Sequence, residues 1–132
     1  MVIAIIAVLA AIVLVNVTQY ISKGKDAAIQ GDMASMLTDS AIYFDSSVAN
    51  ASALCADTAS GFATAYTAAQ GQKPSAGTVD CDGSGTDKTW RAVVQLNNKG
   101  TCTTTAWYCV DSTGNKKVVC DTTPVGAATV CP

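Results

Sequence analysis

The sequence predicts an α+β protein in which one long N-terminal helix packs, through its second half, on a small antiparallel sheet of three or four strands. Three observations support this. An apolar N-terminal run continues into an amphipathic helical pattern, and three short segments near the C-terminus are rich in β-branched and aromatic residues. All six cysteines lie between Cys55 and Cys131. At 132 residues, the chain suffices for one domain with an appendage.

The helix is expected to run from the N-terminus to about Ser47, because the first proline is Pro74 and the early glycines are isolated. Its first fifteen residues are all apolar. Further on, one predicted face is apolar and recurs every three or four positions: Ile29, Met33, Met36, Leu37, Ser40, Ala41 and Phe44. The other faces are expected to be polar: Lys25, Asp26, Gln30, Asp32 and Asp39. Such a helix is about 70 Å long, so its first half must project and be covered by lipid or by copies of itself.

The remaining chain is interpreted as a head. A short helix is expected around residues 60–70, because Gly71 and Pro74 would stop it. Strands are predicted from their composition at three places: Trp90–Leu96, Thr104–Val110 and Lys116–Cys120. The resulting plan has four parts: residues 1–22 as an apolar membrane or filament-core helix, 23–50 as an amphipathic helix half, 51–88 as a connecting loop region, and 89–132 as the antiparallel head with a disulfide-closed tail.

The composition excludes several functions. Charged residues make up 14% of the chain, with a net charge of −2, so no basic face is expected to hold nucleic acid. The sequence contains no histidine and no glutamate, which removes the commonest general base and the commonest zinc ligand. We therefore expect neither an enzyme nor a nucleic-acid-binding protein.

Six cysteines in so short a chain indicate disulfides and an oxidising compartment. A zinc site would need close cysteine pairs, and the spacings here are 26, 21, 7, 11 and 11 residues. Six cysteines allow fifteen pairings. The arrangement of the predicted head favours three pairs: Cys55 with Cys81, Cys109 with Cys131, and Cys102 with Cys120. An exchange of partners between Cys102 and Cys109 remains open.

Three parts of the sequence resemble a known family. IAIIAVLAAIVL (Ile3–Leu14) is similar to the N-terminal helix of type IV pilins and of the related pseudopilins. KGKDAAIQGDMASMLTDSAIYFD (Lys23–Asp45) is similar to the continuation of that helix. WYCVDSTGNKK with a terminal Cys-Pro resembles the end of some small bacterial pilin heads. The resemblance covers residues 1–45 and extends to the head only in pattern.

The resemblance implies a ladle-shaped pilin fold and a major pilin, the structural subunit of an extracellular type IV pilus-like filament that supports adhesion, motility or DNA uptake. The implied partners are many copies of the chain, the inner membrane before assembly, and the pilus assembly machinery. A pseudopilin of a type II secretion or competence system is the alternative within the family, and a membrane-anchored monomeric binding module is the alternative outside it. Eight residues are expected to pack in the filament core: Ile3, Ile5, Ile6, Val8, Leu9, Ile12, Val13 and Leu14.

One departure from the family lies at the start of the chain. Mature pilins open with a motif such as Phe-Thr-Leu-Ile-Glu, after a basic leader that ends in glycine. Met1 matches an apolar position just beyond that motif. We therefore expect six or seven residues to precede Met1. In the family, the glutamate of this motif pairs with the amino terminus of a neighbouring subunit, and no residue of this sequence is assigned that role.

Two weaker site hypotheses come from local motifs. The segment 80–87 resembles the opening of a calcium loop, with ligands expected from Asp80, Asp82 and Asp87, although Arg91 stands where an EF-hand has its final glutamate. A solvated turn is the favoured interpretation of this segment, and no other cofactor is expected. Asn50 and Asn16 begin N-glycosylation sequons. Asn16 would be packed in the filament core, so Asn50 is the candidate, with an ordinary turn residue as the alternative.

Overall fold

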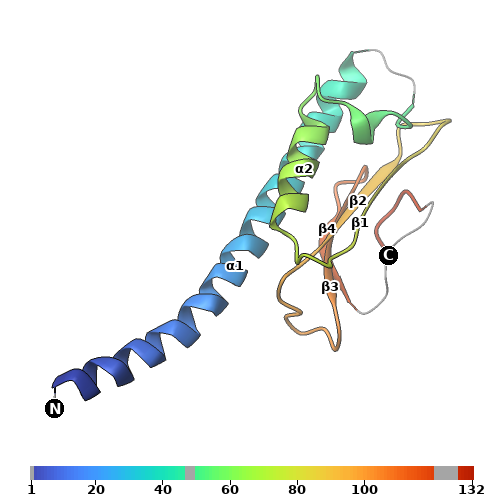
Figure 1. The fold of residues 1–132 in the computed structure, drawn as a ribbon. Coiled ribbons are helices and arrows are strands. Elements are labelled where there is room, and N and C mark those ends of the chain that lie inside the picture. Colours follow the sequence, from blue (N-terminus) through green and yellow to red (C-terminus); the bar gives the residue numbers. More distant parts are fainter. Residues whose placement is uncertain (1, 47–49, 121–127) are drawn as a thin grey trace.

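The computed structural model describes residues 2–46, 50–120 and 128–132, apart from the side chains of residues 14–16. A long helix carries a head built from the other elements (Figure 1). In chain order the elements are α1 (Val2–Asp45), the short 3-10 helix η1 (Leu54–Ala56), α2 (Phe62–Gln72), β1 (Val79–Gly83), β2 (Trp90–Gln95), β3 (Ala106–Asp111) and β4 (Lys116–Cys120). The predicted α+β class is confirmed.

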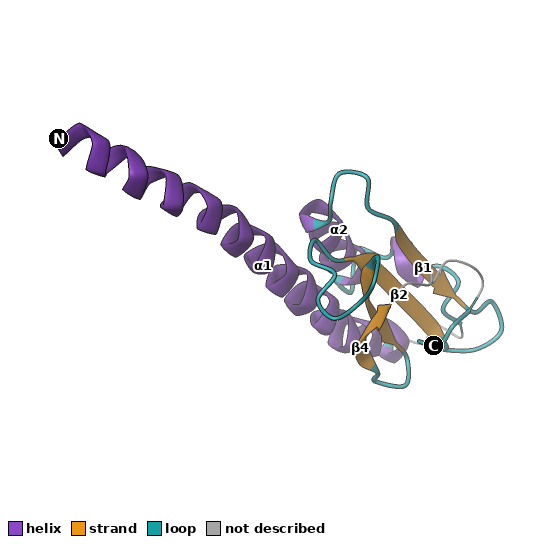
Figure 2. Cartoon of the chain, turned by 90° about the horizontal axis from the view of Figure 1, so that it is seen from below, coloured by secondary structure: helices purple, strands orange, loops and turns teal. Residues whose placement is uncertain are grey.

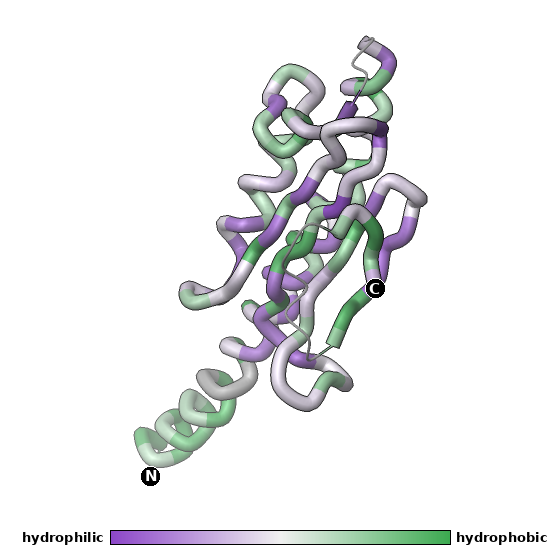
Figure 3. The backbone as a smooth tube through the Cα atoms, turned by 90° about the vertical axis from the view of Figure 1, so that its right-hand side faces the viewer, coloured by the Kyte–Doolittle hydropathy of each residue, from purple (hydrophilic) through white to green (hydrophobic). Residues whose placement is uncertain are grey.

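Helix α1 is one continuous helix of 44 residues, about 66 Å long at 1.5 Å per residue. Its first half stands away from the head in two perpendicular views (Figures 1 and 2). Burial along α1 begins at Asp26. We call residues 2–21 the arm and the rest of the described chain the head. The hydropathy of the residues changes where the two meet: the arm is apolar, and the head mixes apolar and polar residues (Figure 3).

The second half of α1 packs on α2 and the sheet through buried residues spaced by four, three, four and three positions: Ile29, Met33, Met36, Ser40 and Tyr43. The predicted apolar face is therefore confirmed at its centre. It is wrong at Ala41, which is exposed, whereas Phe44 is half-buried and packs against the core. Tyr43 continues the spacing set by Met36 and Ser40, so its ring lies inside. The two rings of Tyr43 and Phe44 meet edge to face at 5.2 Å.

The four strands form an antiparallel meander in the order β1-β2-β3-β4. Alternate residues of β2, namely Trp90, Ala92 and Val94, belong to the core shared with α1 and α2. Trp90 meets Phe62 of α2 edge to face, with ring centroids 4.9 Å apart. The three strands predicted from composition all form, although β3 begins at Ala106 rather than at Thr104.

Strand β1 lies in the segment predicted to be a connecting loop, so that part of the prediction is wrong. Aspartate and glycine are poor strand formers, and this local composition hid the strand. Pairing with β2 over five residues stabilises it. Gly83 is required at its end because a Cβ there would lie 1.9 Å from the carbonyl oxygen of Ala51.

The opposite face of the sheet is also covered. Val93, Cys109 and Val119 form a second small cluster with Cys131 of the C-terminal segment 128–132. Asp111, at the end of β3, is fully buried, and its carboxylate accepts a hydrogen bond from the Cys131 N–H at 2.8 Å. The strands were predicted, but this second layer was not.

Three disulfides connect the head. They join Cys55 to Cys81, Cys102 to Cys120, and Cys109 to Cys131, which are the pairs favoured by the sequence analysis. The first ties η1 to β1, the second ties the loop after β2 to the end of β4, and the third ties the C-terminal segment to β3. Each closure contributes about 3 kcal/mol in the chain-entropy picture, which is substantial for a head with a thin core.

Candidate functional site: an apolar arm on a cross-linked head

The arm presents large apolar side chains that the monomer leaves uncovered. Seven of the eight residues expected to pack in a filament core are between 57 and 84% exposed: Ile3, Ile5, Ile6, Val8, Leu9, Ile12 and Val13. The eighth, Leu14, has its side chain outside the described part of the structure. A helix that is apolar on all sides is normally buried in protein or in a membrane. The head does not cover this surface, and a helix of this kind is expected to be covered by other protein or by lipid.

The exposed apolar surface continues toward the head. Val17, Tyr20 and Ile21 remain 44, 72 and 55% exposed. By length and composition, α1 is the one helix among the described residues that could cross a membrane. Its small residues also shape the surface. Ala4 lies among Ile5, Val8 and Leu9, and together these four line an open apolar hollow of about 360 Å³.

A buried aspartate fixes the point where the arm leaves the head. The carboxylate of Asp26 accepts hydrogen bonds from the backbone N–H and the side-chain amide of Asn97, at 2.6 and 3.1 Å. It also accepts hydrogen bonds from the backbone N–H and the side-chain amide of Asn98, at 3.0 and 2.7 Å. The Asn97 amide also donates to the carbonyl of Gln72, at the end of α2, at 2.8 Å. Asp26 and Asn97 together thus connect α1, α2 and the loop after β2.

The helical spacing predicts Asp26 on one of the polar faces, and the structure corrects this. Asp26 is 8% exposed. A signal was present, because Asp26 precedes Ile29 and Met33 by three and seven positions and so falls on the same face as the buried residues. An acid on an apolar helix face indicates a buried polar contact, because burial without partners would be costly.

The three calcium candidates do not converge on one point. Asp80 and Asp82 lie on β1 and both pair with the buried Arg91, at 3.0 and 3.5 Å. Asp87 instead accepts the backbone N–H and the hydroxyl of Thr89 in the following turn. Burial, followed by the neighbouring charge of Asp80, raises the pKa of Asp82. Within the described residues, no group of three histidine, cysteine or acidic side chains is placed to hold a metal ion.

Asn50 is half-buried, and its side-chain oxygen accepts hydrogen bonds from the N–H and hydroxyl of Ser52, at 3.2 and 2.7 Å. This is the arrangement of a turn residue. The side chain of Asn16, the other sequon, lies outside the described part of the structure.

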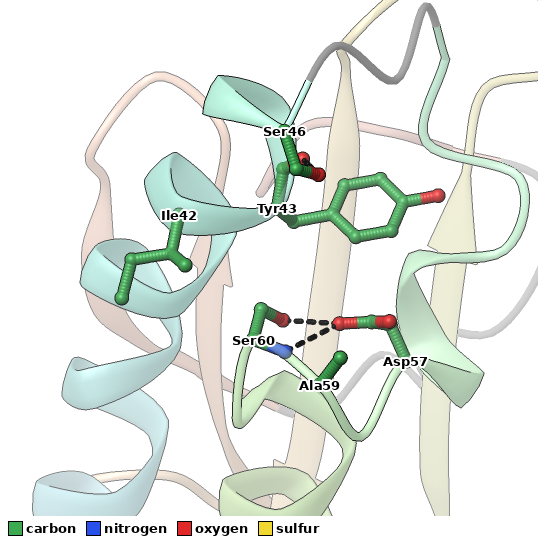
Figure 4. A pocket seen from close by; sticks show the side chains of 6 residues that line it. All are labelled: Ile42, Tyr43, Ser46, Asp57, Ala59 and Ser60. Carbon is green, nitrogen blue, oxygen red and sulfur yellow. Dashed lines mark hydrogen bonds between the residues drawn. The ribbon is translucent and has the colours of Figure 1, made fainter.

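The far end of the head has a pocket of about 190 Å³ between the end of α1 and the segment before α2 (Figure 4). Ile42 and Tyr43 line one side, and Asp57 and Ser60 line the other. The Asp57 carboxylate accepts the Ser60 N–H at 2.8 Å and the Ser60 hydroxyl, and these bonds lower the pKa of Asp57. Asp57 and Ser60 are therefore both engaged in shaping the turn that starts α2.

Comparisons of the chain with protein-family models, with curated proteins and with solved structures gave no significant match.

Proposed function

We propose that this protein is the structural subunit of an extracellular helical filament of the type IV pilus kind. In this filament the arms of many copies pack side by side in the core, and the disulfide-linked heads lie outside. The proposal follows the resemblance of residues 1–45 to the pilin helix and explains why the arm is apolar on every side.

The observation that supports it is the uncovered surface of the arm. Removing several hundred Å² of isoleucine, valine and leucine surface from water is worth about 10 kcal/mol per subunit. Neighbouring arms supply that cover in the fibre. The hollow at Ala4 would receive a side chain of a neighbouring helix, because small residues allow helices to approach closely.

A bilayer would cover the same surface before assembly. α1 has the length and composition for this, so assembly exchanges lipid contacts for contacts with other arms. Repetition of one heterologous contact then generates a helical fibre. The disulfides of the head suit an oxidising exterior.

Electron microscopy of material sheared from the cell surface tests the proposal, and we expect fibres composed of this subunit. Ile12→Asp should abolish them, because a charge on the arm opposes both lipid and helix packing. The matched control is Val118→Asp, the same kind of change at an exposed valine of β4. Loss of fibres with the control but not with Ile12→Asp would locate the assembly contact on the head and contradict the proposal.

Two other outcomes would indicate the alternatives. A subunit that is recovered only in short membrane-bound assemblies would favour a pseudopilin. A complete protein that stays monomeric in detergent and never sediments as fibres would favour an anchored binding module. The filament proposal would be wrong in either case.

A further inference from the structure

Three chain segments meet at the end of the head from which the arm emerges, and we call this end the base. They are residues 22–26 of α1, residues 72–74 at the end of α2 and just beyond it, and residues 97–99 after β2. The hydrogen bonds of Asp26 with Asn97 and Asn98, and of Asn97 with the Gln72 carbonyl, hold the three together. Figure 1 shows the ends of α2 and β2 directed toward this end of the head.

The base is rich in cations. Four of the seven lysines in the sequence belong to it: Lys23, Lys25, Lys73 and Lys99. Lys23 and Lys25 are exposed on α1. The Nζ atoms of Lys73 and Lys99 donate to the carbonyls of Pro74 and Thr103, at 3.4 and 3.1 Å. Each ammonium group has three donors, so both retain capacity for a further ligand.

The acids do not balance these lysines at the base. Asp26 is directed into the head, where the two asparagines hold its carboxylate. Asp80 and Asp82 are paired with Arg91 on the sheet. Among the described residues, the base therefore carries four lysines and a buried carboxylate. Lys23, Lys25 and Lys99 are exposed, and Lys73 is half-buried.

These lysines follow directly after the arm. Ile21 is the last exposed large apolar residue before them, and Tyr20 beside it is 72% exposed. Tyrosine favours the boundary between hydrocarbon and water. Lys23 is only two residues beyond Ile21, a rise of about 3 Å along the helix. When the arm lies in hydrocarbon, the base therefore lies at the depth of the lipid phosphates.

We propose that Lys23, Lys25, Lys73 and Lys99 form a lysine collar that binds the headgroups of anionic phospholipids. The charge of the collar and its position at the end of the apolar arm both match such a surface. The inference rests on the proposed function only in requiring that the arm enters a bilayer. It adds that the subunit selects anionic lipid and that assembly must break these contacts.

The test is a competition between two membranes. The complete protein is diluted from detergent into equal amounts of phosphatidylcholine vesicles and of denser vesicles that also contain phosphatidylglycerol, and its distribution is measured after centrifugation. Burial of the arm is common to both vesicles and cancels from the ratio. We expect a preference for the anionic vesicles that disappears in 1 M salt, where the screening length is about 3 Å.

The paired variants K23Q/K25Q and K116Q/K117Q remove the same charge from exposed positions. We expect the first to lower the preference about 25-fold, at about five-fold for each of the two lysines, and the second to change it less than two-fold. An equal distribution of the unmodified protein, or equal losses with both variants, would overturn the collar.

The outcomes separate the two proposals. A protein that associates with neither vesicle would remove the membrane stage of the proposed function, and the collar with it. A protein that keeps the lipid preference but never forms fibres would overturn the filament and leave the collar standing.

Discussion

Asp26 accepts both the backbone N–H and the side-chain amide of Asn98, at 3.0 and 2.7 Å, across 72 residues of chain. Asn97 makes the equivalent pair of bonds to the other carboxylate oxygen. A carboxylate whose two oxygens are both engaged has a fixed orientation, so this contact sets where the arm leaves the head.

Replacement of Asp26 by alanine should lower the free energy of unfolding by about 3 kcal/mol, because hydrogen bonds to a charged group are lost and buried donors are left without partners. Urea denaturation measures the change. The matched control is Asp45→Ala, on an exposed position of the same helix, which should stay within about 0.5 kcal/mol. Equal effects of the two substitutions would contradict the structural role of Asp26.

Gly83→Ala should destabilise the head by about 3 kcal/mol or more, since the added Cβ would lie 1.9 Å from the backbone oxygen of Ala51. Gly85→Ala, two residues later, meets nothing within 4 Å and should have little effect. Thermal unfolding of both variants checks this. A tolerated Gly83→Ala would mean that the segment at Ala51 does not approach β1 closely.

Low pH should reduce the free energy of unfolding of the head because Asp111 becomes protonated. Burial alone would raise the pKa of this carboxyl, but hydrogen bonds from Thr113, the Cys131 N–H and Asn115 outweigh burial and lower the pKa to about 2. A lowered pKa stabilises the fold above the unfolded value of 3.8, and this contribution of about 2 kcal/mol is lost as the pH falls through 2. Denaturation curves between pH 5 and pH 2 should show the loss, and Asp111→Asn should flatten it. An unchanged pH dependence in that variant would rule out Asp111 as the source.

Removal of the tail disulfide with C109S/C131S should release the C-terminal segment from the sheet and expose Val93 and Val119. We expect a loss of about 3 kcal/mol and faster hydrogen exchange in β3. The comparison is C55S/C81S, which should lose similar stability while β3 stays protected. If β3 exchanges equally in both variants, the outer cluster does not depend on this bond.

Local pattern and the spacing of apolar residues predicted much of the fold. The long helix followed from the absence of proline and from the recurrence at Ile29, Met33 and Met36, all of which are buried. Strands β2 and β4 followed from runs of valine. The disulfide pairs could be favoured because the predicted elements placed particular cysteines near one another, although composition alone could not choose among fifteen pairings.

The features that were missed depend on partners distant in sequence. β1 contains two aspartates and a glycine, and it forms because β2 and the buried Arg91 lie beside it. The burial of Asp111 depends on the C-terminal segment, which a local pattern cannot place. The contact of Asp26 joins residues 71 and 72 positions apart. Of the candidate site, the arm was predicted, whereas its fixed junction with the head was not.

All six cysteines follow α1 in the sequence, so no covalent bond other than the main chain ties that helix to the sheet. Tension applied to the arm reaches the sheet through side-chain packing and the hydrogen bonds of Asp26. The loops and the C-terminal segment, in contrast, are cross-linked to the strands by disulfides. Under sufficient pull, we therefore expect the packing of α1 on the sheet to fail before the disulfide-linked segments come apart. The contact between α1 and the sheet therefore sets the mechanical strength of the molecule. This contact contains no disulfide, so reducing agents do not cleave it.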